Sequence, residues 1–172
     1  MADTGLQTTR LELRPLPAAA AGALPEDRES AARLLGVTLS VEWPHGDLVE
    51  LLPPQAAASL DDEAFGVWVI IERESATVVG DIGFTGPPGA DRTVEIGYSV
   101  VPDRRGRGYA TEAARALVDW ALSQPQVGVL VAGCDQENAP SIRILERIGF
   151  IRTGDTNGQL RWRLDITRDD QG

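Results

Sequence analysis

The spacing of apolar and polar residues divides the chain into short strands and helices. Residues Thr9–Arg14 alternate between polar and apolar side chains, which is typical of a half-buried strand, and Pro15 stops it. The run Phe65–Glu72 is too apolar for a sheet edge and predicts an interior strand. Further strands are predicted at Thr77–Phe84, Thr93–Val101, Val127–Cys134, Phe150–Thr153 and Leu160–Ile166, the last two as a hairpin around Thr156–Gly158.

Helices are predicted between these strands. In Tyr109–Leu122, alanines and larger apolar residues recur at helical spacing and form one stripe. Asn138 is placed to cap the next helix, and Gly149 to end it. The expected inner face of that helix consists of Ile142, Leu145 and Ile148.

The region before the interior strand has a weaker pattern. Ala18–Leu35 is rich in alanine, with a helix start at Pro25–Asp27, and a short helix is predicted at Gln55–Asp61. Prolines interrupt Glu42–Pro54, which fits no single element. Three residues at or just beyond the end of this stretch are expected to pack inward: Leu34, Leu35 and Val37.

This order of elements predicts one α/β domain, residues 1–172 with a core of about 9–166. Its sheet is expected to be mixed, mostly antiparallel, with about six to seven strands and helices on both faces. No apolar run approaches the roughly 20 residues of a membrane span. Met1–Arg14 is polar and lacks an apolar signal segment, and Arg168–Gly172 is expected to be a frayed tail.

Composition narrows the class of partner. The formal net charge is −10, and all basic charge comes from arginine because the chain has no lysine. Such a chain is a poor general binder of nucleic acid and favours a cationic partner, although the charge also serves solubility. The single cysteine, Cys134, lies in an apolar run, is expected to be a buried structural thiol, and suits a reducing cytoplasm.

The segment Arg104–Thr111 carries the clearest candidate site. Two glycines between a predicted strand and a predicted helix let backbone N–H groups approach a phosphorylated ligand. A nucleoside-triphosphate loop would need a lysine. A dinucleotide loop, as in a nucleotide-binding oxidoreductase, would need Gly or Ala where Thr111 stands. The simpler alternative is a glycine-rich turn with surface arginines.

Within this segment, Arg105-x-x-Gly108-x-Ala110 resembles the pyrophosphate loop of the GNAT superfamily of N-acetyltransferases, which hold acetyl-coenzyme A (acetyl-CoA). Other motifs in matching order are Thr9–Pro15, Gly80–Phe84, Glu95–Tyr98, Ala110–Ala113, Asn138–Ser141 and Glu146–Phe150. Together they resemble the branch that contains the ribosomal-protein N-terminal acetyltransferases. The resemblance runs from about Thr9 to Ile166, is weakest between Leu16 and Ala64, and implies the acetyl-CoA N-acyltransferase fold.

The resemblance implies which residues hold acetyl-CoA. Backbone N–H groups of the loop would wrap the pyrophosphate, with Thr111 on the first helical turn. The loop residues concerned are Gly106, Arg107, Gly108, Tyr109 and Ala110. Arg105 and Arg107 would add charge; the alternative is that one of them simply faces water. Asn138 and Ser141 stand at cofactor-contact positions, although simple helix capping also explains them. The N–H of Val100 or Val101 would stabilise the carbonyl oxygen, where neighbouring parallel strands splay apart. No metal is implied.

Acetyl transfer to an amine also needs a base, since an amine with a pKa of about 10 is mostly protonated at neutral pH. Glu95 is the first candidate, on the same strand face as Gly97 and Ser99; pairing with an arginine is the structural alternative. Asp81 is a weaker candidate, and His45 is either a surface residue or part of a substrate loop. Many relatives use a tyrosine as general acid after the Asn138 position. None stands there, so Ser141 is the available hydroxyl, or the thiolate leaves unaided.

The resemblance therefore predicts an acetyl-CoA-dependent N-acetyltransferase acting by direct attack in a ternary complex. The acceptor is a primary amine, either a protein N-terminus or a small amine, and neither nucleic acid nor membrane is an expected partner. A non-catalytic acyl-CoA-binding protein of the same fold is the alternative, suggested by the missing tyrosine. The sequence leaves open the identity of the acceptor and whether the chain forms a homodimer, as relatives frequently do.

Overall fold

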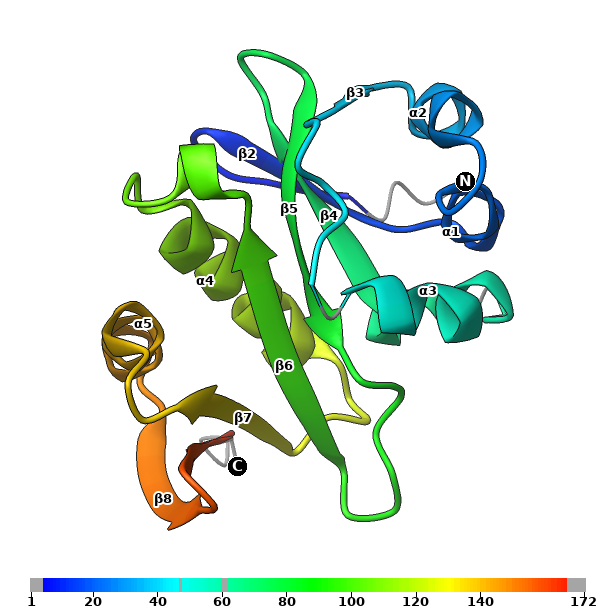
Figure 1. Ribbon diagram of the computed structural model, residues 1–172. Helices are drawn as coiled ribbons and strands as arrows, with labels where there is room; N and C mark the ends of the chain where they lie inside the picture. Colours follow the sequence, from blue (N-terminus) through cyan, green and yellow to red (C-terminus); the bar gives the residue numbers. More distant parts are fainter. Residues whose placement is uncertain (1–4, 47, 60–61, 167–172) are drawn as a thin grey trace.

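The computed structural model describes residues 5–46, 48–59 and 62–166, which form one mixed sheet with flanking helices (Figure 1). The strand order is β1-β2-β4-β5-β6-β7-β9-β8, and β3 pairs with β5 outside this path. The strands are β1 (Leu6–Gln7), β2 (Leu11–Pro15), β3 (Thr38–Leu39), β4 (Val67–Glu72), β5 (Thr77–Phe84), β6 (Thr93–Val100), β7 (Val129–Asp135), β8 (Ile151–Thr156) and β9 (Gln159–Asp165). The helices are α1 (Ala18–Ala23), α2 (Arg28–Leu35), α3 (Leu48–Ala56), α4 (Tyr109–Ser123) and α5 (Ala139–Ile148), with 3-10 turns η1 (Glu63–Phe65) and η2 (Pro102–Arg104).

The sheet divides between β6 and β7. These strands run parallel and pair only over Thr93–Glu95 and Val129–Val131. Beyond Glu95 they diverge, as Figure 1 shows for the two arrows. Each strand keeps its antiparallel partner on the other side, β5 for β6 and β9 for β7. The sheet is therefore mostly antiparallel with an opening at its centre, and the predicted fold class is confirmed. The two strands beyond the predicted number, β1 and β3, have two residues each.

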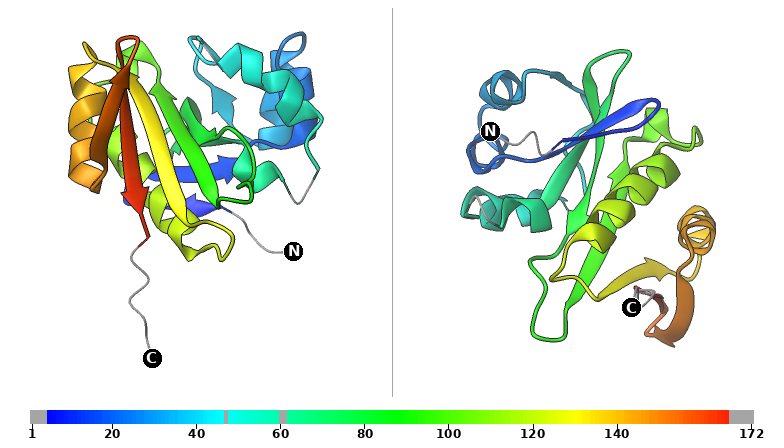
Figure 2. Two further views of the ribbon diagram at one scale, coloured as in Figure 1. Left: turned by 90° about the horizontal axis from the view of Figure 1, so that it is seen from below. Right: turned by 180° about the vertical axis from the view of Figure 1, so that it is seen from behind.

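Helices cover both faces of the sheet. Helix α4 lies across one face and contacts β1, β2, β5 and β6, whereas α1, α2 and α3 pack together on the other side (Figure 2). Helix α5 lies beside α4. None of the helices in the described ranges is long and apolar enough to span a membrane.

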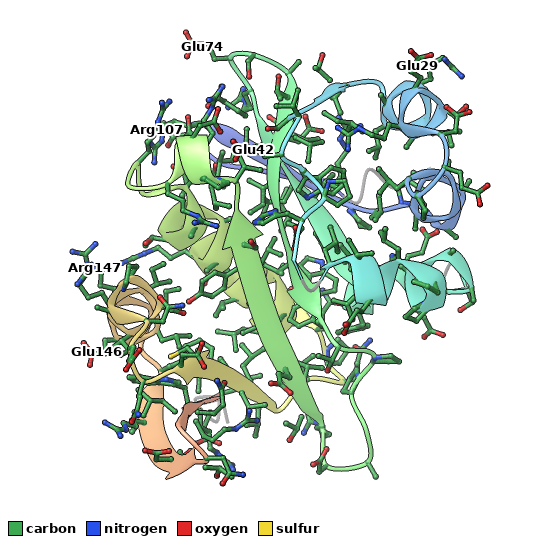
Figure 3. All side chains as sticks on the ribbon, viewed as in Figure 1. Glu29, Glu42, Glu74, Arg107, Glu146 and Arg147 are labelled. Carbon is green, nitrogen blue, oxygen red and sulfur yellow. The ribbon has the colours of Figure 1, made fainter. Side chains whose placement is uncertain are left out.

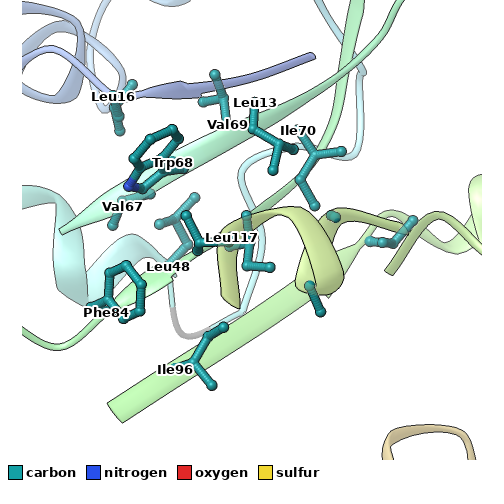
Figure 4. Close-up of a cluster of buried hydrophobic side chains, with 14 of the residues drawn as sticks. Leu13, Leu16, Leu48, Val67, Trp68, Val69, Ile70, Phe84, Ile96 and Leu117 are labelled. Carbon is teal, nitrogen blue, oxygen red and sulfur yellow. The ribbon is translucent and has the colours of Figure 1, made fainter. Parts of the chain in front are cut away.

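Aromatic side chains pack the sheet against α4. Trp68 of β4 and Phe84 of β5 pack against Trp120 of α4, with ring centroids 5.2 and 6.0 Å apart, respectively. Leu117, one helical turn before Trp120, is fully buried beside them (Figure 4). Burial of such side chains stabilises a fold by about 1.5–3 kcal/mol each. This packing holds β4 and β5 against α4, and β5 carries part of the site.

The structure corrects two local predictions. The helix expected at Gln55–Asp61 begins earlier, at Leu48, and includes Pro53 and Pro54. Burial of its inner face and a hydrogen bond from the Gln55 side chain to the Leu16 carbonyl (2.8 Å) offset the loss of helical hydrogen bonds at the prolines. Residues 60–61 and the predicted tail at 168–172 lie outside the described residues.

The second correction concerns Leu34, which is 55% exposed rather than packed inward. Ala31 and Leu35 form the buried stripe of α2, and Leu34 lies one position off that stripe. The alanine-rich stretch is two helices, and the predicted start before the second is confirmed: the Asp27 side chain accepts a hydrogen bond from the Ser30 N–H at 3.0 Å.

Candidate active site

A cavity of about 570 Å³ passes through the sheet where β6 and β7 diverge. On the α5 side it is bounded by β7 and the start of α5, and on the α3 side by β5, β6 and the loop before α3. Five candidate residues from the sequence line it: Arg105, Asn138, Ser141, Asp81 and His45. Its lining also includes Gly97, Tyr98, Ser99, Cys134 and Leu51.

The loop between η2 and α4 lies at the end of β6. Gly106 and Gly108 adopt left-handed conformations, with φ of 75° and 83°. This backbone favours glycine because side chains with a Cβ are strained there. The first intrahelical bond of α4 runs from the Glu112 N–H to the Gly108 carbonyl at 3.0 Å. The N–H groups from Gly108 to Thr111 therefore have no helical partner, as an anion site at a helix start requires.

The side chains of Arg10 and Tyr109 stabilise the loop. Arg10 donates to the Arg107 carbonyl at 2.8 Å, pairs with Glu112 at 2.8 Å, and lies 4.6 Å above the Tyr109 ring. Tyr109 is buried and donates to Glu72 at 2.7 Å, and this bond lowers the pKa of Glu72. The side chain of Tyr109 is thus committed to the fold, so only its backbone N–H can serve the predicted cofactor contact.

The two arginines of the loop differ in position. Arg105 lines the cavity and donates from Nε to the Val100 carbonyl at 2.9 Å. Arg107 is exposed and projects from the loop (Figure 3). Val101 donates its N–H to the Val79 carbonyl at 2.9 Å, so that group faces β5. Because N–H groups alternate along a strand, the Val100 N–H faces the opening between β6 and β7.

The start of α5 contributes the predicted pair Asn138 and Ser141. The Asn138 side chain accepts a hydrogen bond from the Ser141 N–H at 3.2 Å, so Asn138 is the N-cap. Both residues also line the cavity, which makes capping and ligand contact compatible. The Ser141 hydroxyl lies 2.7 Å from the hydroxyl of Tyr98. Burial raises the pKa of Tyr98.

Tyr98 belongs to the motif Glu95–Tyr98 but has no predicted role there, because it precedes α5 by some 40 residues and lies on β6. Its side chain lies on the opposite face of β6 from Ser99. A tyrosine hydroxyl thus stands beside the predicted acid even though the position after Asn138 has none.

Glu95 lies at the last paired position of β6, opposite Val131. Its side chain is 39% exposed, and its Oε1 lies 3.4 Å from Nη1 of Arg161 on β9. Arg161 reaches Glu95 across Gly133, where an added Cβ would lie 2.8 Å from Nη1. Glu95 is not among the residues that line the cavity, so its surroundings match the alternative of a structural partner for an arginine.

Asp81 lies on β5, opposite Ser99, and lines the cavity. Burial raises its pKa to about 7, although the hydrogen bond from Trp43 Nε1 (3.0 Å) acts in the opposite direction. A carboxyl group with a pKa near neutrality is suited to proton transfer at neutral pH. Of the two carboxylates predicted from the sequence, Asp81 has the environment of a base.

His45 lies beside Asp81 because its loop is folded over the sheet. Its Nε2 is hydrogen-bonded to Ser99 Oγ at 2.9 Å, whereas its buried Nδ1 finds no hydrogen-bond partner among the described residues. Arg28 of α2 donates to the carbonyls of Trp43 and Ser40 and so holds the loop. His45 therefore lines the cavity and is not a surface residue, and its role in a substrate loop stays a prediction. In the described ranges, no cluster of histidine, cysteine and acidic residues could hold a metal ion.

Arg105, Asn138 and Ser141 thus border the same opening in the sheet as Asp81, whose side chain is partly buried. Comparison with known proteins shows the family to which the chain belongs. The profile of the Acetyltransferase (GNAT) domain family matches residues 10–151. The chain belongs to this family of acetyltransferases. The uncharacterized N-acetyltransferase YjdG of Bacillus subtilis is 32% identical over 149 residues, 85% of this chain and 89% of the relative.

Solved structures share the GNAT fold. Ribosomal-protein-S5-alanine acetyltransferase from Vibrio fischeri has a TM-score of 0.70 at 13% identity, covering 96% of this chain and 98% of that one. The microcin C7 self-immunity acetyltransferase MccE, solved in complex with acetyl-CoA and AMP, has a TM-score of 0.65 at 17% identity, with coverage of 96% and 98%. The predicted family, with ribosomal-protein acetyltransferases among its structural neighbours, is confirmed.

As a GNAT enzyme, the protein is an N-acetyltransferase with acetyl-CoA as its co-substrate. Membership replaces the nucleotide-binding oxidoreductase as an explanation of the glycine-rich loop. The loop residues fit the pyrophosphate of this ligand, because unpaired N–H groups and the positive end of α4 meet at one point. The individual residue roles stay predictions.

Proposed function

We propose that the protein transfers the acetyl group of acetyl-CoA to a primary amine, either a protein N-terminus or a small amine, by direct attack in a ternary complex. The observation that carries this proposal is the cavity through the sheet. Its lining includes Arg105 of the glycine-rich loop and the carboxyl group of Asp81, whose pKa is about 7. Donor and acceptor can thus approach from opposite faces and meet between β6 and β7.

In this proposal the N–H groups of Gly106 to Thr111 bind the pyrophosphate, and Arg105 adds positive charge beside them. The rest of the cofactor extends along the opening toward Asn138 and Ser141. The thioester oxygen lies near the N–H of Val100, which faces the opening. A fixed N–H donor at this point stabilises the negative charge that develops on the oxygen during attack.

Asp81 is proposed to accept the proton of the acceptor ammonium group, directly or through water. The freed nitrogen lone pair forms a bond to the thioester carbon, and the carbon–sulfur bond breaks. The departing thiolate takes a proton from Ser141 Oγ, whose hydroxyl contacts Tyr98, and the second proton that the nitrogen loses as it becomes an amide returns to Ser141 Oγ. The proton on Asp81 then passes to solvent. This assignment moves the role of base from Glu95 to Asp81, since Glu95 pairs with Arg161 and Asp81 lines the cavity.

The proposal is tested by incubating the protein with acetyl-CoA and a panel of amines and peptides, with thiol release and the mass of the acetylated product as readouts. Thiol release that depends on both protein and amine is expected. Intact-protein mass after incubation with acetyl-CoA alone should show no acetylated enzyme, because attack is direct. Binding of acetyl-CoA without turnover on any amine would support the alternative, a non-catalytic acyl-CoA-binding protein.

A further inference from the structure

On the side of α3, the cavity is hollow at Gly97, which has no side chain to fill it, whereas a Cβ built on neighbouring Gly83 would meet the backbone of Gly66. Gly83 of β5 pairs with Gly97 of β6, between Asp81 and Ser99 on one side and Thr85 on the other. A Cβ built on Gly97 would meet no atom within 4 Å. Glycine inside a strand weakens it and often marks the close approach of a ligand. We call this hollow the acceptor pocket, formed by His45, Leu48, Leu51, Val67, Asp81, Gly83, Thr85, Gly97 and Ser99.

The far walls of the acceptor pocket are apolar. Leu48 and Val67 are 3% and 5% exposed, and Leu51 is 41% exposed at the rim. Among the described residues of this pocket, Asp81 supplies the single carboxyl group. The other carboxylate in the cavity lining, Asp135 on β7, accepts a hydrogen bond from Gln159.

This distribution of charge separates classes of amine. An ammonium group beside Asp81 has a partner, but each further ammonium group buried here would lack one and would lose hydration. A polyamine or an aminoglycoside carries several such groups. A single amine on an apolar group leaves nothing unpaired and buries its carbon atoms against Leu48, Leu51 and Val67.

We infer that the acceptor is a primary amine on an apolar carbon group, and that Gly97 sets the size of the group admitted. The inference rests on the proposed function. A free apolar amine and a peptide with an apolar first residue share this chemistry. Leucinamide and a peptide beginning with leucine therefore enter the test as separate arms.

Gly97→Val probes the pocket without disturbing the protein around it. Its side chain would project into space that no protein atom occupies, and valine suits a strand. Gly154→Val is the matched control, because a Cβ at Gly154 of exposed β8 also meets nothing within 4 Å. Both variants should fold and bind acetyl-CoA with wild-type affinity.

The experiment measures kcat/KM for straight-chain alkylamines of increasing length, leucinamide, the leucine-initiated peptide and spermidine. For the wild type, each added methylene group should raise kcat/KM by about fourfold until the pocket is full, with spermidine among the poorest substrates. Gly97→Val should lower kcat/KM for leucinamide and the longer amines by about 10-fold or more, and Gly154→Val should leave it unchanged. If the leucine-initiated peptide is acetylated and leucinamide is not, the acceptor is a peptide N-terminus.

Two results would overturn the inference while leaving the proposed function intact. One is a preference for spermidine over every apolar amine, and the other is an unaltered substrate profile in Gly97→Val. If no amine is acetylated, the proposed function fails. The inference is then judged by calorimetric titration of leucinamide into the acetyl-CoA complex, where binding should be present in the wild type and weakened in Gly97→Val.

Discussion

At the scale of single residues, the contact between Tyr98 and Ser141 bears on how the thiolate leaves. Ser141 alone is a poor acid. Its hydroxyl lies 2.7 Å from that of Tyr98, and either can be the donor; in the proposed mechanism Tyr98 donates, so that the Ser141 proton points toward the cavity. Tyr98 then acts through Ser141 as a positioning residue. The helix cap is separate, because Asn138 accepts from the backbone N–H of Ser141.

Ser141→Ala should lower kcat by about 10- to 100-fold, because it removes the proton donor and keeps the capped N–H. Its cost in stability should be about 1 kcal/mol or less. Tyr98→Phe should lower kcat by a smaller factor with little change in KM for acetyl-CoA. In the double variant, Tyr98→Phe should add no further loss, since its effect passes through Ser141.

Kinetics and thermal melting of the four proteins provide the check. Losses of kcat that multiply in the double variant would show that Tyr98 acts independently. Full activity of Ser141→Ala with a lowered melting temperature would leave Ser141 with a structural role only.

Residue roles were only partly predictable from the sequence. The motifs around the loop glycines, Asn138 and Ser141 are local, and the structure places Arg105, Asn138 and Ser141 in the lining of one cavity. The choice between Glu95 and Asp81 depends on burial, and burial depends on a loop that Arg28 holds over the sheet. Tyr98 and Ser141 meet only because β6 and α5 border the same opening. Such contacts between distant segments leave no pattern in a single sequence.

At the scale of elements, the loop before α4 is proposed to bind the cofactor. The left-handed backbone at Gly108 points consecutive N–H groups to one place. The C-cap of α2, Gly36, has a similar conformation, with φ of 69° and open space around its Cα. Substitution of Gly36 therefore measures the cost of backbone strain alone, and substitution of Gly108 measures that cost together with any loss of cofactor binding.

Gly108→Leu should abolish detectable binding of acetyl-CoA or weaken it by about 100-fold, because a side chain displaces both the backbone and the phosphate. Gly36→Leu should cost a similar 1–2 kcal/mol of stability and keep wild-type affinity. Titration calorimetry with acetyl-CoA and thermal melting measure the two effects. Equal affinity in both variants would remove the loop from the cofactor site.

The regular elements were the most predictable part of the fold. Strands with an apolar pattern and α4 with its stripe follow from periodicity, since local spacing and tertiary burial agree there. Helix α3 is not what its prolines predict. It includes Pro53 and Pro54, because the burial of Leu52 and Gln55 stabilises it. The loop before it depends on contacts with α2 and β5, so its placement could not be read from local chemistry.

At the scale of the whole molecule, Asp81 links the site to stability. Its pKa is raised from 3.8 to about 7 in the folded protein, so the folded state holds a proton that the unfolded state releases near pH 4. The stabilisation from the neutral carboxyl group is full below about pH 4. It is lost progressively as the pH rises to about 7, and then becomes constant.

Asp81→Asn should remove this dependence, because asparagine stays neutral and can still accept the bond from Trp43. The variant and the wild type should have similar stability near pH 4. The variant should become more stable by up to a few kcal/mol at pH 7 and above. Urea unfolding of both proteins between pH 4 and pH 8 measures the difference. A difference that does not vary with pH would show that Asp81 ionises at its ordinary pKa.

The most direct test of the account compares acetyl transfer by Asp81→Asn and Glu95→Gln over the same pH range. If Asp81 is the base, Asp81→Asn should lower kcat/KM by about 100-fold or more at neutral pH and should still bind acetyl-CoA. The rate of this variant should also lack the rise near pH 7. Glu95→Gln should keep that rise and lose less than about 10-fold. The opposite ranking, with Glu95→Gln nearly inactive and Asp81→Asn close to wild type, would contradict the account and place the base on β6.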